Sequence, residues 1–226
     1  MRQPFHPWTP DHLAVLALTA AAAGWLGFGW KPHASARTWA RVAAALLFVN
    51  ETAALWIAWQ QGHPRIPLQL CDIALFLSVW ALWGAPTLVM ELAYFWGLSG
   101  SLQALLTPDL HQAFPDYWWI KFFITHSGAA LAAVYLGRSG RVAPTPRSLW
   151  RVWGLTNVYA ACVGIVNGIW GMNYGYLAHK PSQPSLLDQF GPWPWYLLSM
   201  EGVALLSMAL CYAPFALRRA PEARHG

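Results

Sequence analysis

The sequence has few charged residues and lacks the short motifs of several large function classes. Only 10% of its 226 residues are Asp, Glu, Lys or Arg, whereas 57% are hydrophobic. Soluble domains have about 25% charged residues, so a solvated surface would be hard to build here. No CxxC pair, metal-type spacing or phosphate-binding loop is present, so we expect neither a metal nor another cofactor. Three dispersed cysteines give no disulfide framework.

The net charge of +5 does not indicate nucleic acid as a partner. The basic residues lie between apolar stretches instead of gathering in one patch, a distribution typical of membrane topology. We therefore expect a multi-pass protein of the cell membrane, with membrane lipids as its partners. The oligomeric state is not indicated by the sequence.

Seven apolar stretches are long enough for membrane spans, which need about 20 residues each. With no internal repeat and no room for a soluble domain between them, residues 1–226 are expected to form one all-α domain, a bundle of seven transmembrane helices. The expected spans are residues 11–30, 40–60, 67–86, 88–107, 117–137, 150–172 and 193–216.

The basic residues predict the orientation of the bundle. With seven spans, the N-terminal side holds four basic residues, Arg2, Arg65, Lys121 and Lys180. The opposite side holds ten, Lys31, Arg37, Arg41, Arg138, Arg141, Arg147, Arg151, Arg218, Arg219 and Arg224. Because cytoplasmic loops carry the excess of Lys and Arg, we expect the N-terminus outside and the C-terminus in the cytoplasm.

Residues 63–74 contain a candidate nucleophile. Two prolines end one apolar stretch and begin the next, and Pro is well placed in a first helical turn. Cys71 then lies about one turn inside a new helix, near the positive end of the helix dipole, which favours a thiolate. Cys162 and Cys211 are expected to be ordinary apolar core residues.

Five ionisable residues are predicted at membrane depth, where each is a functional candidate. They are Glu51, Asp72, Glu91, His126 and Glu201. His126 is predicted at a depth similar to that of Cys71, so it is the candidate general base, although a structural hydrogen bond between helices would also suit a buried histidine. Glu91 is expected to be structural, and Glu51 has no evident ionisable neighbour at its own level.

The segment after the sixth span is rich in polar groups. It contains Asn173, Tyr174, Tyr176 and Lys180, together with several glycines. Two interpretations remain open: a helix end closed by interfacial residues, or a polar lid that binds a headgroup or an ester carbonyl.

Two motifs in this layout resemble those of the YwaF-like integral membrane proteins: Ile-Pro-Leu-Gln-Leu-Cys-Asp at 66–72 and Asn-Tyr-Gly-Tyr-Leu-Ala-His-Lys-Pro at 173–181. That family looks related to an animal transmembrane acyltransferase of ether phospholipids and, more distantly, to the androgen-induced hydrolases of fatty-acid esters. The resemblance implies that Cys71 is a nucleophile and that His126 is its companion. The hydrolases use threonine, so the cysteine favours the acyltransferase branch.

The leading hypothesis is therefore a lipid acyltransferase or lipid-ester hydrolase that works through a thioester on Cys71, with His126 relaying the proton. Supporting or substrate-binding roles are assigned to Gln69, Asp72, Asn173, Tyr174, Tyr176, Lys180, Glu51 and Glu201. One alternative is a proton- or cation-coupled transporter that uses Glu51, His126 and Glu201. Another is a lipid-binding membrane protein without catalysis.

Overall fold

The computed structural model describes residues 4–183 and 185–219, and in these residues the fold is helical with no strand. A single isolated bridge joins Pro4 and Gln112. The helices run in the order α1 (Pro10–Gly24), η1 (Trp25–Gly29), α2 (Ala36–Gln60), α3 (Leu70–Trp83), α4 (Thr87–Phe95), η2 (Trp96–Gly100), α5 (Ser101–Leu106), α6 (Tyr117–Arg138), α7 (Pro146–Trp170), η3 (Tyr174–Tyr176), η4 (Leu186–Phe190) and α8 (Trp195–Arg219).

Five helical segments are long and apolar enough to cross a membrane. They are Pro10–Gly29, Ala36–Gln60, Tyr117–Arg138, Pro146–Trp170 and Trp195–Arg219. Each coincides with one of the expected spans to within a few residues. The chain is therefore a multi-pass helical membrane protein.

The other two expected spans are not among these five segments. Residues 67–86 were expected to be one span, but α3 has only 14 residues. At 1.5 Å per residue it is about 21 Å long, shorter than the roughly 30 Å hydrocarbon core. The expected helix over residues 88–107 is present as an unbroken helical stretch, in which α4 continues through the π-helical η2 into α5. Seven crossings and the orientation of the termini stay predictions, and Arg2 and Arg224 of the charge count lie outside the described residues.

Local sequence signals explain where several helices begin and end. Asp116 caps α6 by accepting a hydrogen bond from the Trp118 backbone nitrogen at 2.9 Å. At the start of α7, Thr145 and Ser148 form a reciprocal capping box, followed by Pro146 in the first turn. The same helix ends at Gly171, whose left-handed conformation (φ 64°) suits glycine.

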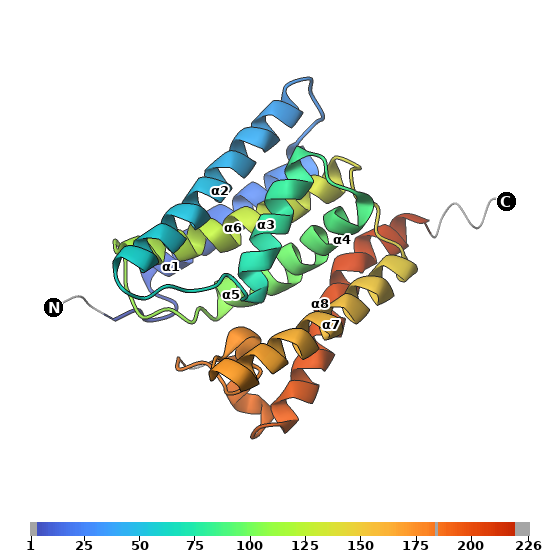
Figure 1. Cartoon of the computed structure of the whole chain (residues 1–226). Coiled ribbons are helices and arrows are strands. Elements are labelled where there is room, and N and C mark those ends of the chain that lie inside the picture. The colour runs from blue at the N-terminus through green and yellow to red at the C-terminus, as the bar shows by residue number, and fades with distance from the viewer. Residues whose placement is uncertain (1–3, 184, 220–226) are drawn as a thin grey trace.

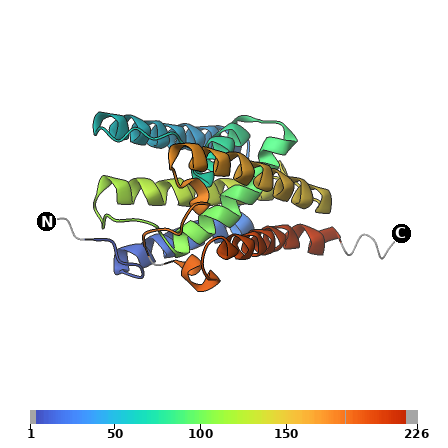
Figure 2. The same cartoon turned by 60° about the horizontal axis from the view of Figure 1, so that its bottom comes forward.

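Helix α6 is the centre of the bundle. It packs against α1, α2, α3, α4 and α5, whereas α7 and α8 pair with each other along one side (Figure 1). Small residues allow this close packing, since a Cβ on Gly128 would lie 2.3 Å from the Leu47 side chain. Turned by 60°, the bundle has α1 beginning toward one end and α8 finishing at the other (Figure 2).

Candidate active site

The connection between α2 and α3 brings Cys71 to the start of a helix. Residues 63–69 have neither helix nor strand, and α3 begins at Leu70, three residues after Pro67. The expectation that Pro67 lies in the first helical turn is therefore wrong, because Gln69 is still extended (φ −62°, ψ 144°). Cys71 is the second residue of α3 and is partly exposed. It is closer to the helix N-terminus than the sequence indicated.

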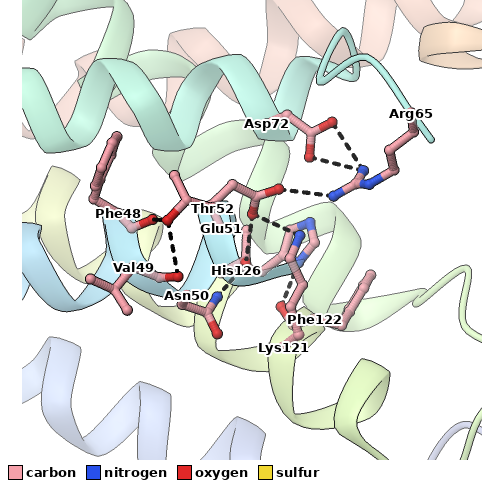
Figure 3. A network of polar contacts seen from close by, with 11 residues as sticks. Phe48, Val49, Asn50, Glu51, Thr52, Arg65, Asp72, Lys121, Phe122 and His126 are labelled. Carbon is pink, nitrogen blue, oxygen red and sulfur yellow. Dashed lines mark hydrogen bonds and ion pairs between the residues drawn. The ribbon is translucent and has the colours of Figure 1, made fainter. Parts of the chain in front are cut away.

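A buried carboxylate on α2 connects this helix start to α6. The side chain of Glu51 is fully buried. Its Oε1 lies 2.8 Å from Nη2 of Arg65, and its Oε2 lies 2.7 Å from Nζ of Lys121 (Figure 3). The expectation that Glu51 has no ionisable neighbour is wrong, because Arg65 reaches it from the α2–α3 connection and Lys121 reaches it from α6.

The same network includes the residue after Cys71. The guanidinium of Arg65 forks, and its Nη1 lies 3.3 Å from Oδ2 of Asp72 (Figure 3). Asp72 is 2% exposed, so its buried negative charge is also compensated by the Arg65 guanidinium. We call Glu51, Arg65, Asp72 and Lys121 the charge network. It balances two carboxylates with two cations and connects α2, the α2–α3 connection, α3 and α6.

Neutral side chains extend the charge network on α6. The Thr125 hydroxyl donates to Oε2 of Glu51 at 3.4 Å and accepts from the Asn50 amide at 3.2 Å. Lys121 and Thr125 are four residues apart, so both lie on the face of α6 that meets α2. Every member is thus held by at least one polar partner, as buried polar groups require.

His126 lies next to this face of α6. Its Nδ1 is 2.8 Å from the carbonyl oxygen of Phe122, and its ring packs against the Phe122 ring (centroids 4.1 Å apart). A carbonyl only accepts hydrogen bonds, so Nδ1 carries the proton and Nε2 keeps a lone pair. The imidazole is therefore fixed in the tautomer that can act as a base through Nε2.

The structure brings the helices of Cys71 and His126 together but records no hydrogen bond between these two described side chains. Helices α3 and α6 pack directly, and Leu75 and Ala129 share a core cluster with Leu47. The charge network joins their neighbours in sequence, because it connects Asp72, which follows Cys71, to Lys121, five residues before His126. Direct pairing of the thiol with the imidazole stays a prediction.

The polar segment after α7 docks over the start of α3. The Gly175 backbone nitrogen donates to Oε1 of Gln69 at 2.8 Å. Nearby, the Tyr159 hydroxyl donates to the Leu68 carbonyl at 2.8 Å, and the Tyr196 hydroxyl donates to the Tyr176 carbonyl. We call residues 173–180 the outer loop, after the orientation predicted from the sequence. Its anchor on Gln69 is two residues from Cys71.

Most polar side chains of the outer loop have structural partners. Asn173 accepts from the backbone nitrogens of Ala178 and His179 and donates back to the His179 carbonyl. The backbone of Tyr174 exchanges two hydrogen bonds with the Asn167 amide, and the Lys180 ammonium lies 5.7 Å from the centre of the Tyr196 ring. These contacts favour the interpretation of a helix end closed by interfacial residues. They also hold the outer loop in place over the start of α3.

Tyr176 has a further anchor outside the loop. Its hydroxyl donates to Oδ2 of Asp109 at 2.8 Å. Burial and the Asp109 carboxylate raise the pKa of Tyr176 above its usual range. The phenol therefore stays protonated and keeps donating at physiological pH.

The remaining predicted residues lie apart from the charge network. Glu201 accepts from the indole nitrogen of Trp153 at 3.1 Å and from the Asn157 amide at 3.2 Å, so it belongs to the α7–α8 pair. Glu91 pairs with Arg151 and accepts from Ser148 at 2.7 Å, a structural role at the start of α7.

The other two cysteines have different surroundings. Cys162 on α7 is exposed in the structure, contrary to the expectation of a core residue, because that face of α7 has no helix against it within the described chain. Cys211 is buried in the main core cluster. In the described ranges, no group of three or more His, Cys, Asp or Glu side chains could hold a metal ion.

Arg65 and Lys121 are the site residues that sequence reasoning missed. Both were counted only as loop charges that set the orientation. The available signal was the depth of Glu51 in its helix, since a carboxylate there needs a partner. The two cations of α2 itself, Arg37 and Arg41, lie in the first turns of the helix, more than two turns from Glu51.

Helical spans together with a buried charge network define a multi-pass membrane protein whose polar interior is built by α2, α3 and α6. The chain belongs to the TMEM164 family, whose family model matches residues 7–212. No curated protein and no solved structure matches it.

Proposed function

We propose that this protein is an intramembrane lipid acyltransferase or lipid-ester hydrolase in which Cys71 is the nucleophile and His126 the general base. The proposal is supported by the resemblance of the motifs at 66–72 and 173–181 to those of the YwaF-like integral membrane proteins, a family that looks related to an animal transmembrane acyltransferase. The TMEM164 family match covers both motifs. The observation that carries it is the position of Cys71. It stands in the first turn of α3, between Gln69, which anchors the outer loop, and Asp72 of the charge network.

The reaction has two steps. His126 Nε2 takes the thiol proton, and the sulfur of Cys71 attacks the ester carbonyl carbon of a lipid. The C–S bond forms, the ester C–O bond breaks, and the imidazolium returns the proton to the departing oxygen. Water or a lysolipid hydroxyl then attacks the thioester, with His126 again taking the proton. This step releases a fatty acid or a new ester and restores the thiol.

Proton transfer requires Cys71 and His126 to come within hydrogen-bond reach, directly or through one water. Catalytic hydrogen bonds often tighten only when substrate is bound, so the absence of one between these described residues is compatible with the mechanism. The charge network restrains both regions, because Asp72 follows Cys71 and Lys121 precedes His126 on α6. Its members are positioning residues in this proposal.

The developing oxyanion needs a donor near Cys71. Gln69 is a better candidate than Asn173, because its oxygen accepts from Gly175 and its amide nitrogen has no recorded acceptor within residues 4–183 and 185–219. Asn173 is engaged on both sides by residues of the outer loop.

The proposal is tested with purified protein in lipid nanodiscs that contain a phospholipid with an isotope-labelled acyl chain. Wild type is expected to release or transfer the labelled chain and to carry it on Cys71 as a hydroxylamine-sensitive adduct. Cys71→Ala should lose both signals, while Cys162→Ala and Cys211→Ala keep them. Equal turnover in wild type and Cys71→Ala would remove the nucleophile assignment.

A second candidate is a proton- or cation-coupled transporter. The burial of Glu51 between Arg65 and Lys121 favours it, because ionisable residues inside membrane helices commonly mark ion pathways and proton relays. Glu201, the other carboxylate of that hypothesis, belongs to the α7–α8 pair instead. Substrate flux into proteoliposomes that survives Cys71→Ser but not Glu51→Gln supports transport. Bound lipid that is never cleaved supports the third candidate, a non-catalytic lipid-binding protein.

A further inference from the structure

A second polar site lies at the far end of α3, away from Cys71. It is a cavity of about 210 Å³ at the end of the bundle where α3 finishes and α2 begins. Cys71 and Trp83 are 12 residues apart on one helix, so about 18 Å of helix separates the two places. The cavity is lined by Arg37, Arg41, Leu82, Trp83, Gly84 and Arg141.

Arg141 is fixed at this cavity by the end of α3. From the α6–α7 connection, its Nη1 donates to the Leu82 carbonyl at 3.0 Å and its Nη2 to the Ala81 carbonyl at 2.7 Å. These bonds satisfy carbonyls that a helix C-terminus leaves without a partner. A guanidinium has five N–H donors, so Arg141 keeps three for a further ligand.

The other two arginines come from the first turns of α2. Arg41 lies over the Trp83 ring, with its guanidinium carbon 5.8 Å from the ring centre. Arg37 is one turn earlier, on the same face of the helix. No carboxylate lines the cavity, and none of the three arginines takes part in an ion pair recorded within residues 4–183 and 185–219.

Three guanidinium groups around one cavity repel one another unless an anion lies between them. The excess of basic residues at this end of the bundle explains why the charge around the cavity is positive. It does not explain why arginines from two separate segments face one cavity, or why Arg141 is held in place by backbone carbonyls. Arginine forks match the oxygen geometry of phosphate and bind it bidentately.

We propose that this cavity binds a phosphate group, supplied either by the headgroup of an anionic phospholipid or by free phosphate. Its volume is below the 300–1,000 Å³ of pockets for drug-sized ligands and suits a compact anion. The half-exposed Trp83 lies beside the arginines, as aromatic residues do at the headgroup level of a membrane. The site is independent of the reaction proposed for Cys71.

The test uses the full chain in two arms. In the first, nanodiscs of phosphatidylcholine with phosphatidylglycerol are dissolved in mild detergent, and phosphatidylglycerol that remains bound is counted by native mass spectrometry. In the second, inorganic phosphate is titrated against the protein in detergent while its melting temperature is followed. The variant is Arg37→Gln/Arg41→Gln, whose side chains are exposed, so the fold should persist. Arg147→Gln, at the same end and also exposed, is the matched control.

Hydrogen bonds to charged groups contribute enough that losing two arginines should weaken binding about tenfold or more. Loss of bound phosphatidylglycerol in the double variant but not in the control supports a headgroup site. A melting shift with inorganic phosphate in wild type but not in the double variant supports a free-phosphate site. Equal binding by all three proteins in both arms overturns the proposal, as does an equal loss in the double variant and the control.

Discussion

Lys121 Nζ on α6 lies 2.7 Å from Glu51 Oε2 on α2, in a position where neither charge is well solvated. Arg65 holds the other oxygen of the same carboxylate and also reaches Asp72. One buried carboxylate therefore ties together the two helices that carry the proposed nucleophile and base. Removing one of these charges should therefore lower the free energy of unfolding by more than the loss of an ordinary surface ion pair, which contributes about 0–1 kcal/mol.

Substituting Glu51→Gln is expected to lower the free energy of unfolding by about 3–5 kcal/mol, because it leaves two cations facing a neutral group. Unfolding of the detergent-solubilised protein, followed by circular dichroism, measures this loss. Lys121→Met alone should also destabilise. If the pair is coupled, the double variant Glu51→Gln/Lys121→Met should lose clearly less stability than the sum of the two single changes. Simple additivity would contradict the pairing.

Substituting Gln69→Ala should release the outer loop from the start of α3. The hydrogen bond from Gly175 to Gln69 contributes about 1 kcal/mol, so local opening should increase roughly fivefold. Hydrogen exchange at residues 173–180 measures this change. Gln103→Ala is the control, since Gln103 is exposed on α5. Unchanged exchange in Gln69→Ala would argue against loop docking.

Raising the pH should also weaken the outer loop. The pKa of Tyr176 in the folded protein lies above the value of about 10 expected for an unfolded tyrosine. The stability that its hydrogen bond to Asp109 supplies is therefore complete below about pH 10 and falls as the pH rises beyond that value. Tyr176→Phe removes the hydroxyl and should abolish this pH dependence in hydrogen exchange of the loop. A variant that keeps the same alkaline transition would show that another group is responsible.

Two glycines should respond in opposite ways to alanine. A Cβ on Gly97 would lie 3.0 Å from the Ala129 carbonyl oxygen, a backbone atom that cannot move aside, so Gly97→Ala should destabilise by about 1–3 kcal/mol. A Cβ on Gly164 meets nothing within 4 Å. Because alanine favours a helix over glycine, Gly164→Ala should stabilise by up to about 1 kcal/mol. Melting temperatures of the two variants provide the comparison. Unchanged stability in Gly97→Ala would contradict the packing of η2 on α6, and a loss in Gly164→Ala would contradict the open space beside α7.

Apolar length predicted the helices well, because each long span satisfies its own backbone hydrogen bonds and needs no information about neighbours. The start of α3 was not predictable to the residue, since Gln69 forms its hydrogen bond with Gly175, 106 positions away. The partners of Glu51 were missed for a similar reason. Sequence indicates the depth of a residue in a span, but not which direction it faces or how far Arg65 extends from a loop.

The most direct measurement of the central claim is the site of acylation on the purified protein. After incubation with a phospholipid that carries a labelled acyl chain, the protein is digested and its acylated peptides are mapped by mass spectrometry. We predict a thioester on Cys71 that forms in wild type, forms more slowly in His126→Ala because the base for the first step is missing, and is absent in Cys71→Ala. Lipid turnover in wild type that continues unchanged in Cys71→Ala, with no acyl group ever found on Cys71, would contradict it.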